Sequence, residues 1–209
     1  MPIIAQIRSA DSRVLLGLSV GVGLLRVLAT AFEWTLIGWL TVFLAPLLSL
    51  AIWILFALVC TASLIHALRG RVPLRRRMLP LGISSAVLLL VLWVPWTPIW
   101  LDLNFRLYRS DRMQVVTQVQ SGTLRPNVSY NPTLISLPRG LRHVSKGGGE
   151  VVVQHYAGGM EVLFFTFRGI LDNYAGFVYR SDGSSPRGEM EEYREVERLT
   201  EHWYWVSSS

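Results

Sequence analysis

Three long runs of apolar residues occupy the first half of the chain. Residues 34–67 and 78–101 contain no Asp, Glu, Lys or Arg, and an earlier run from Val14 to Phe32 carries a single charge, Arg26. An apolar run of roughly 18 residues or more is long enough for a helix to cross a bilayer. The pattern therefore predicts three transmembrane spans, at about residues 14–33, 42–67 and 79–100.

The run from Trp34 to Ala67 is longer than one crossing needs. We expect a short connection near Trp34–Trp39, with the indoles at the membrane interface, and Pro46 in the first turn of the second span, where a missing N–H matters least. In the first span, Gly17 and Gly21 have the small-residue spacing that lets membrane helices approach closely.

Five arginines without an acid separate the second and third apolar runs. Residues 69–77 read Arg-Gly-Arg-Val-Pro-Leu-Arg-Arg-Arg, and a short Arg-rich loop between spans is typical of the cytoplasmic side. With this loop inside, the third span places residues 102–209 outside the cytoplasm. The arginines on which this topology rests are Arg69, Arg71, Arg75, Arg76 and Arg77.

The first apolar run allows two interpretations. We favour a retained span in which Arg26 and Glu33, seven residues apart, lie near one helix face and form an intramembrane pair. The alternative is a signal peptide over residues 8–31 that is cleaved after Ala29-Thr30-Ala31. Both interpretations leave the C-terminal half outside the cytoplasm.

From Asp102 onward the pattern changes to that of an α+β domain. Asp102 is a candidate N-cap for a juxtamembrane helix over residues 103–120, and Gly122 a candidate end. Four or five antiparallel strands with turn-forming connectors follow. We expect the strands at residues 134–137, 150–156, 161–167, 174–180 and 193–199, and a terminal aromatic segment with Trp203 and Trp205 on the core side.

Three arginines on the predicted juxtamembrane helix are spaced three residues apart. Arg106, Arg109 and Arg112 follow the third span closely. Two interpretations stay open: contact with lipid head groups, because anionic lipid attracts basic side chains near the membrane surface, or a solvated helix face. Further along, the charged run from Glu189 to Arg198 is typical of a solvated edge.

Charge and cysteine content argue against nucleic-acid binding and against a disulfide within one chain. The net charge of +6 lies wholly in residues 1–101, which hold eight arginines and two acids, whereas residues 102–209 hold twelve basic and twelve acidic residues. A neutral globular half argues against nucleic-acid binding. Cys60 is the only cysteine, so no disulfide forms within one chain. Nineteen arginines against one lysine indicate a bacterial source.

No catalytic motif is convincing in the exported half. Ser145 and Lys146 precede three glycines, but the order does not match a phosphate-binding loop and predicts a turn. The weak polar-site candidates are His143, His155 and Asp172, whose spacings match no close-set metal-ligand pattern. We expect no metal and no cofactor.

The favoured hypothesis is an integral protein of the bacterial inner membrane that presents a small extracytoplasmic domain for binding or scaffolding. Its partners would be the bilayer and other membrane or envelope proteins, and it would not be an enzyme. Two alternatives stay open: a membrane-tethered hydrolase that uses the three polar-site candidates, and an accessory transporter subunit built on Arg26 and Glu33. The sequence does not indicate the oligomeric state.

Overall fold

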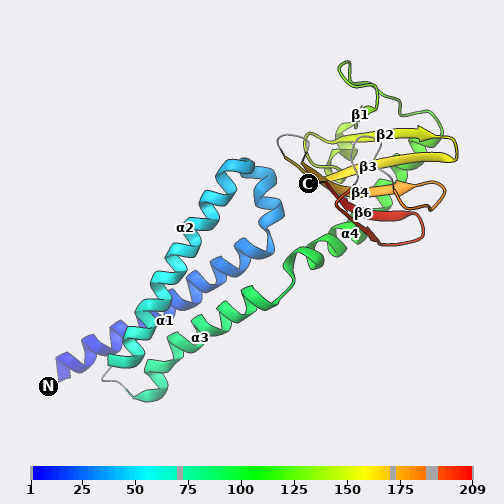
Figure 1. Ribbon diagram of the computed structural model, residues 1–209. Helices are drawn as coiled ribbons and strands as arrows, with labels where there is room; N and C mark the ends of the chain where they lie inside the picture. The colour runs from blue at the N-terminus through cyan, green and yellow to red at the C-terminus, as the bar shows by residue number, and fades with distance from the viewer. Residues whose placement is uncertain (1, 70–72, 170–172, 187–192, 209) are drawn as a thin grey trace. The chain divides into compact units, whose positions relative to one another are not determined.

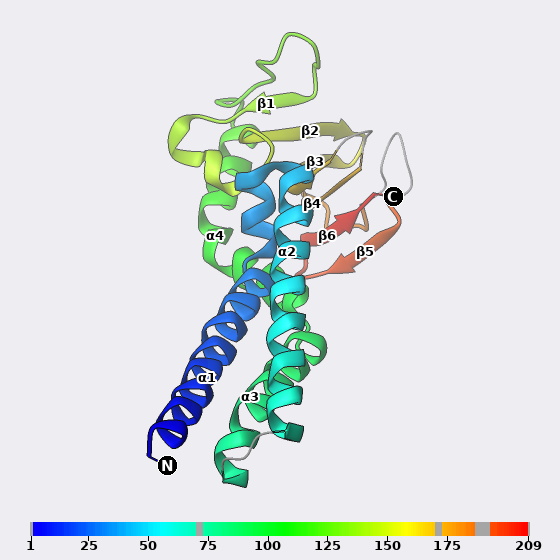
Figure 2. The same ribbon diagram turned by 90° about the vertical axis from the view of Figure 1, so that its left-hand side faces the viewer.

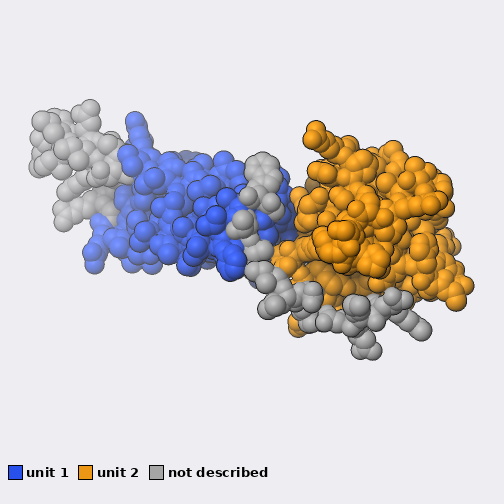
Figure 3. Space-filling view, turned by 90° about the horizontal axis from the view of Figure 1, so that it is seen from above, with its two compact units in different colours: residues 1–101 blue, residues 102–209 orange. Residues whose placement is uncertain are grey.

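The computed structural model describes residues 2–69, 73–169, 173–186 and 193–208, without the side chains of residues 2–11, 38, 39, 41 and 42. The chain divides into two compact units, Met1–Leu101 and Asp102–Ser209 (Figure 3). The boundary falls where the apolar runs end and the charged, alternating sequence begins.

Unit 1 is made of three long helices (Figure 1), α1 (Pro2–Ala31), α2 (Glu33–Arg69) and α3 (Leu74–Trp93). Among the described residues these helices provide three segments long and apolar enough to cross a membrane: Ser12–Ala31, Phe43–Arg69 and Leu74–Trp93. Their large apolar side chains are extensively exposed, for example Phe43, Leu58 and Leu92. The predicted helical half of the fold is confirmed.

Three of the expected helix boundaries were wrong. The juxtamembrane helix begins at Trp96 instead of residue 103, so Asp102 lies inside it and is not its N-cap. The connection near Trp34–Trp39 is helical and forms the first part of α2, which Figure 1 shows bent away from the long remainder of that helix. The third helix ends at Trp93 instead of continuing to residue 100, because Pro95 disfavours helical backbone at the preceding residue. Val94 accordingly adopts extended angles, with φ −78° and ψ 126°.

The three helices pack through small and polar side chains. Ser19 and Ser63 hydroxyls hydrogen-bond at 3.2 Å, and a Cβ built on Gly23 would lie 3.0 Å from Val87 Cγ2. The close approach is therefore at Gly23. Gly17 and Gly21 also have the small-residue spacing, but no heavy atom lies within 4 Å of a Cβ built on either.

Unit 2 is an α+β domain with one antiparallel sheet. Helix α4 (Trp96–Gln120) begins in unit 1 and continues into unit 2, and the short helix η1 (Arg139–Val144) lies between β1 and β2. The sheet order is β1-β2-β3-β4-β6-β5, with β1 and β5 at its two edges (Figures 1 and 2). The strands are β1 (Leu134–Ser136), β2 (Glu150–Tyr156), β3 (Gly159–Arg168), β4 (Tyr174–Arg180), β5 (Glu195–Arg198) and β6 (Trp203–Ser207).

The α+β prediction is confirmed, with six strands instead of four or five. The additional strand is β6, the aromatic terminal segment, which pairs with β4 on one side and β5 on the other. Strands β2 and β3 form a hairpin, whose register ends at Tyr156 and Gly159.

Both faces of the sheet carry apolar side chains. On the face covered by α4, Phe105 of the helix packs against Phe177 and Trp203, with ring centroids 5.4 and 5.5 Å apart. Trp203 is fully buried there, and the alternation along β6 places Trp205 on the same face. The opposite side, which we call the second face, carries the buried cluster Leu163, Phe165, Val178, Tyr204 and Val206.

The glycine run that follows Ser145 is a fixed turn. Gly147, Gly148 and Gly149 all have positive φ, between 71° and 101°, a conformation that other residues adopt at a steric cost. The buried hydroxyl of Ser145 donates to the Glu150 carbonyl and accepts from the Phe165 amide. The serine is therefore engaged in holding η1 to β2 and β3.

Candidate functional site

A buried ion pair lies on the second face of the sheet. Glu161 of β3 and Arg180 of β4 are cross-strand partners, and Arg180 Nη1 donates to Glu161 Oε2 at 2.9 Å. Their side chains are only 5% and 10% exposed. Alternation along the two strands places both on the side of Leu163 and Val178. The charged pair therefore lies on the same face as the apolar cluster.

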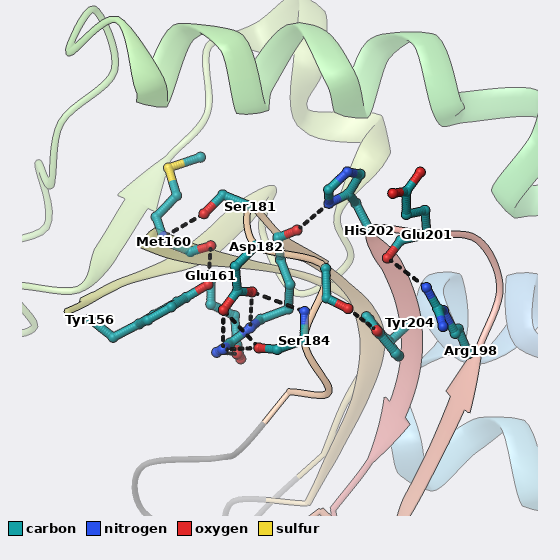
Figure 4. A network of polar contacts seen from close by, with 12 residues as sticks. Tyr156, Met160, Glu161, Ser181, Asp182, Ser184, Arg198, Glu201, His202 and Tyr204 are labelled. Atoms are coloured by element: carbon teal, nitrogen blue, oxygen red, sulfur yellow. Dashed lines mark hydrogen bonds and ion pairs between the residues drawn. The ribbon is translucent and has the colours of Figure 1, made fainter. Parts of the chain in front are cut away.

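The turn after β4 closes around the same guanidinium (Figure 4). Arg180 Nη2 donates to Ser184 Oγ at 2.6 Å, and Arg180 Nε lies 3.3 Å from Asp182 Oδ1. The Tyr156 ring packs against the guanidinium carbon at 3.9 Å, within cation–π range. These contacts surround Arg180 with oxygen acceptors and one aromatic face.

The carboxylate of Asp182 is held in its charged form. Desolvation alone would raise the pKa of Asp182, but hydrogen bonds donated by Ser184 and Tyr156 and the positive charge of Arg180 outweigh it. The net result is a pKa well below the usual range of an aspartate. Asp182 is therefore ionised at all ordinary pH values.

Two tyrosine hydroxyls bond to the turn and to the buried carboxylate. The Tyr193 hydroxyl donates to Glu161 Oε1 at 3.0 Å, and the Tyr204 hydroxyl donates to the Gly183 carbonyl at 2.6 Å. Burial, followed by the negative charge of Glu161, raises the pKa of Tyr193 well above its ordinary value. We call the set Tyr156, Glu161, Arg180, Asp182, Ser184 and Tyr193 the Arg180 network.

An open groove of about 500 Å³ borders this network and is lined by Gln154, Tyr156, Ala157, Gly158, Glu161, Arg180, Asp182, Ser184 and Ser185. The guanidinium is already engaged by carboxylate and hydroxyl oxygens, which leaves it poorly placed to bind an added anion. None of the described lining residues is a histidine, cysteine or lysine. The contacts position the turn after β4 against the sheet. The Ser184 hydroxyl donates to Asp182 Oδ2 at 2.8 Å, but the lowered pKa of Asp182 makes that carboxylate a weak base.

The two described polar-site candidates, His143 and His155, lie on different elements and make no contact with each other. His143 of η1 pairs with Asp111 of α4, Nε2 to Oδ2 at 2.7 Å, and its ring centroid lies 5.0 Å from that of Tyr108. His155 is exposed near the end of β2, opposite Met160. Asp172 lies outside the described residues. Within the described part of the chain, no three His, Cys, Asp or Glu side chains gather as metal ligands.

The three spaced arginines of α4 have different environments. Arg106 is exposed and pairs with Asp102 at 2.8 Å, and Arg109 is exposed. Both interpretations, lipid contact and a solvated face, are wrong for Arg112, because Arg112 is 2% exposed. Its guanidinium donates to the carbonyls of Asn104, Phe105 and Val144 and to the Asn104 amide oxygen.

Burial also shifts the pKa of Arg112. Desolvation lowers its pKa to about 10, which still leaves the guanidinium charged at neutral pH. Its carbon lies 4.4 Å from the centroid of the Phe177 ring. Arg112 therefore connects α4, η1 and the sheet from inside the domain.

In unit 1, Arg26 faces the neighbouring helix. It is 5% exposed, its Nη1 lies 3.4 Å from Ser49 Oγ, and its guanidinium carbon lies 4.1 Å above the Trp53 ring. Among the described residues, Arg26 and Glu33 form no salt bridge, in contrast to the predicted pair. Glu33 is exposed and lines a cavity of about 320 Å³ together with Ser49 and Trp53.

The arginines of the predicted cytoplasmic loop flank the connection between α2 and α3. Arg69 is the last residue of α2, and Arg75, Arg76 and Arg77 lie in the first turn of α3. Arg71 lies outside the described residues. The four described arginines thus gather at one end of each of two neighbouring apolar helices.

Sequence reasoning did not identify the Arg180 network. The available signal was Glu161, an acid that shares a strand face with Leu163 and Phe165 and therefore requires a buried partner. When the chain is compared with known proteins, no family model, no curated protein and no solved structure matches it.

Proposed function

We propose that this chain is an integral protein of a bacterial inner membrane that holds a small binding domain on the extracytoplasmic side, as one subunit of an envelope complex. The observation that carries this proposal is the distribution of apolar surface and charge over unit 1. Exposed Leu, Phe and Val side chains cover α1, α2 and α3, and exposed apolar surface on this scale is favourable in lipid.

The direction of insertion rests on the arginines at the α2–α3 connection. Arg69, Arg75, Arg76 and Arg77 lie at the adjoining ends of the two helices, and basic residues near span ends favour the cytoplasmic side. Three crossings then leave the N-terminus inside and residues 102–209 outside.

Binding is proposed for unit 2 because its buried charged side chains hold the fold together and are not arranged for catalysis. The buried charged side chains Arg112, Glu161 and Arg180 are engaged in contacts that hold the fold together, and the serine of the glycine turn is engaged likewise. A domain of this kind presents a rigid surface to a partner. Arg106 and Arg109, both exposed on α4, would add contact with anionic lipid head groups.

Topology is tested with reporter fusions to the full chain. Alkaline phosphatase fused after residue 209 should be active and a cytoplasmic fluorescent reporter at the same point dark, with the opposite pattern for fusions within residues 69–77. Protease added to spheroplasts should digest unit 2. An inactive C-terminal phosphatase together with a protected unit 2 would reverse the topology.

Partner binding is tested separately, in the native membrane. A photo-crosslinking residue placed on unit 2 should yield discrete adducts with envelope proteins that mass spectrometry identifies. The same residue placed on a lipid-facing position of α2, such as Leu58, serves as the control. Crosslinks from unit 2 that do not exceed this control would contradict a binding role.

A further inference from the structure

The two edge strands of the sheet differ in whether their outward backbone groups are hydrogen-bonded. At the β1 edge, all four backbone groups that point away from β2 are paired: the Leu134 amide donates to the Asn131 carbonyl, the Leu134 carbonyl accepts from the Asn127 amide, and the Asn127 side chain bonds both the amide and the carbonyl of Ser136. This edge is closed to another strand.

At the β5 edge the corresponding backbone groups are open. The Leu199 amide donates to the Trp203 carbonyl, and in an antiparallel ladder the hydrogen-bonded pairs alternate. Glu195, Glu197 and Leu199 therefore turn their backbone toward β6, and Val196 and Arg198 turn theirs outward. Within the described residues, nothing accepts from or donates to these outward groups of Val196 and Arg198.

The residues of the open edge are exposed and carry alternating charges. β5 reads Glu-Val-Glu-Arg, and all four residues are exposed. Alternation places Glu195 and Glu197 on one face of the strand, and Val196 and Arg198 on the other. Arg194 precedes the strand, and its amide donates to the Ser207 carbonyl of β6. The edge thus combines free backbone groups with an apolar centre and an ordered set of charges.

This pattern disfavours pairing with a second copy of the same strand. In an antiparallel pair centred on Val196, Glu195 faces the other copy's Glu197, and Glu197 faces its Glu195. Like charges directly opposite one another destabilise a sheet. A strand of complementary charge, in contrast, gains an attraction at Glu195, Glu197 and Arg198.

We propose that β5 is a docking edge for an extended segment of a partner protein that carries bases opposite Glu195 and Glu197, an apolar residue opposite Val196 and an acid opposite Arg198, and that adds a seventh strand to the sheet. The inference rests on the proposed binding function and assigns it to one surface. Because the central base-apolar-base pattern is the same in both directions, the segment fits in parallel or antiparallel orientation. Main-chain hydrogen bonds supply affinity, and the flanking charges supply selectivity.

The test uses the full chain in lipid nanodiscs and two labelled peptides of equal net charge, Thr-Glu-Lys-Val-Lys-Glu-Thr and Thr-Lys-Glu-Val-Glu-Lys-Thr, with blocked termini. Fluorescence anisotropy should show the first peptide binding at least about tenfold more tightly than the second. Equal binding of the two peptides, or none, would overturn the proposal.

Two variants separate the backbone from the charges. Val196→Pro removes an outward amide that β6 does not use, and it should abolish binding, whereas Val196→Thr keeps the amide and should retain it. The double variant Glu195→Lys/Glu197→Lys should lose the preference for the first peptide. If the first peptide still binds the Val196→Pro variant, β5 is not its docking edge. If the wild type is a dimer that Val196→Pro dissociates, β5 pairs with a second copy of the chain, and the proposal of a partner protein is wrong.

Failure of the edge is distinguishable from failure of the binding function. If envelope proteins crosslink to unit 2 in the membrane and Val196→Pro leaves those adducts unchanged, the β5 edge is not the docking surface, although unit 2 still binds. If neither peptides nor envelope proteins engage unit 2, both proposals are wrong.

Discussion

Glu161 and Arg180 face each other across β3 and β4 and form an ion pair of 2.9 Å that is almost fully buried. A second ion pair, between Glu150 of β2 and Arg168 of β3, has a similar separation of 2.6 Å but lies nearer the surface. The chain thus contains an internal comparison between a buried and a more accessible pair of the same two residue types.

Glu161→Gln should destabilise unit 2 strongly, and Glu150→Gln should not. Removing one partner of a buried pair leaves an uncompensated charge, at a cost of about 3 kcal/mol here because Asp182 still neutralises Arg180 in part. The more exposed pair contributes less than about 1 kcal/mol. Hydrogen-exchange mass spectrometry of β3 and β4 in the full chain measures both losses. Equal losses would show that burial does not distinguish the pairs.

Tyr193 should make the stability of unit 2 sensitive to alkaline pH. Its folded pKa lies above the ordinary value of 10.0 because of burial and the Glu161 carboxylate. The contribution is therefore fully present below pH 10 and is lost as the pH rises further, since only the unfolded phenol ionises there. Unfolding of the wild type and of Tyr193→Phe, followed from pH 7 to 11, should show a steeper alkaline decline in the wild type.

Tyr130 provides the matched control for this pH dependence. Its hydroxyl also donates to a glutamate, Glu150, at 3.4 Å, but Tyr130 is exposed. Tyr130→Phe should follow the wild-type pH profile. If Tyr193→Phe retained the full alkaline decline, the titrating group would lie elsewhere.

Arg112 should be indispensable for the packing of α4. Arg112→Met removes the donors for four oxygen acceptors, two of them shielded with the guanidinium from solvent, at a cost of about 3 kcal/mol. Arg109→Met removes an exposed side chain, whose loss should change stability by less than about 0.5 kcal/mol. Faster exchange of the η1 amides in the first variant only is the expected result. Similar exchange in both would exclude the proposed role of Arg112.

The class of fold could be predicted because it depends on runs and periods that each segment carries by itself. Uncharged stretches determine the long helices, and alternation with turn residues determines strands such as Glu150–Tyr156. The helix end at Trp93 depends on Pro95, which the sequence displays, but the apolar run continues to Leu101 and extends the predicted span to about residue 100.

The candidate sites could not be predicted because they depend on register and on helix rotation. Arg106 and Arg112 are six residues apart, which turns the second about 120° around the helix from the first. Equal spacing therefore gives one an exposed position and the other a buried one. The partner of Glu161 is 19 residues away, and only the pairing of β3 with β4 brings it opposite.

Gly23 should be the residue at which the packing of the apolar helices is most easily disturbed. A Cβ at this position would already lie 3.0 Å from Val87 of α3, and Val87 packs against the cluster of Val22, Phe56 and Val59. Cys60, the only cysteine of the chain, packs against the same cluster and reports on it without an engineered label. Gly23→Leu should therefore separate α1 from α3 and expose the Cys60 thiol. Overpacking costs about 1–3 kcal/mol, so maleimide labelling in native membranes should accelerate by about fivefold or more.

Gly17→Leu adds the same side chain where no heavy atom lies within 4 Å of a Cβ, and its labelling rate should equal that of the wild type. Acceleration by both variants would mean that added bulk on α1, and not the contact between Gly23 and Val87, controls access to the thiol.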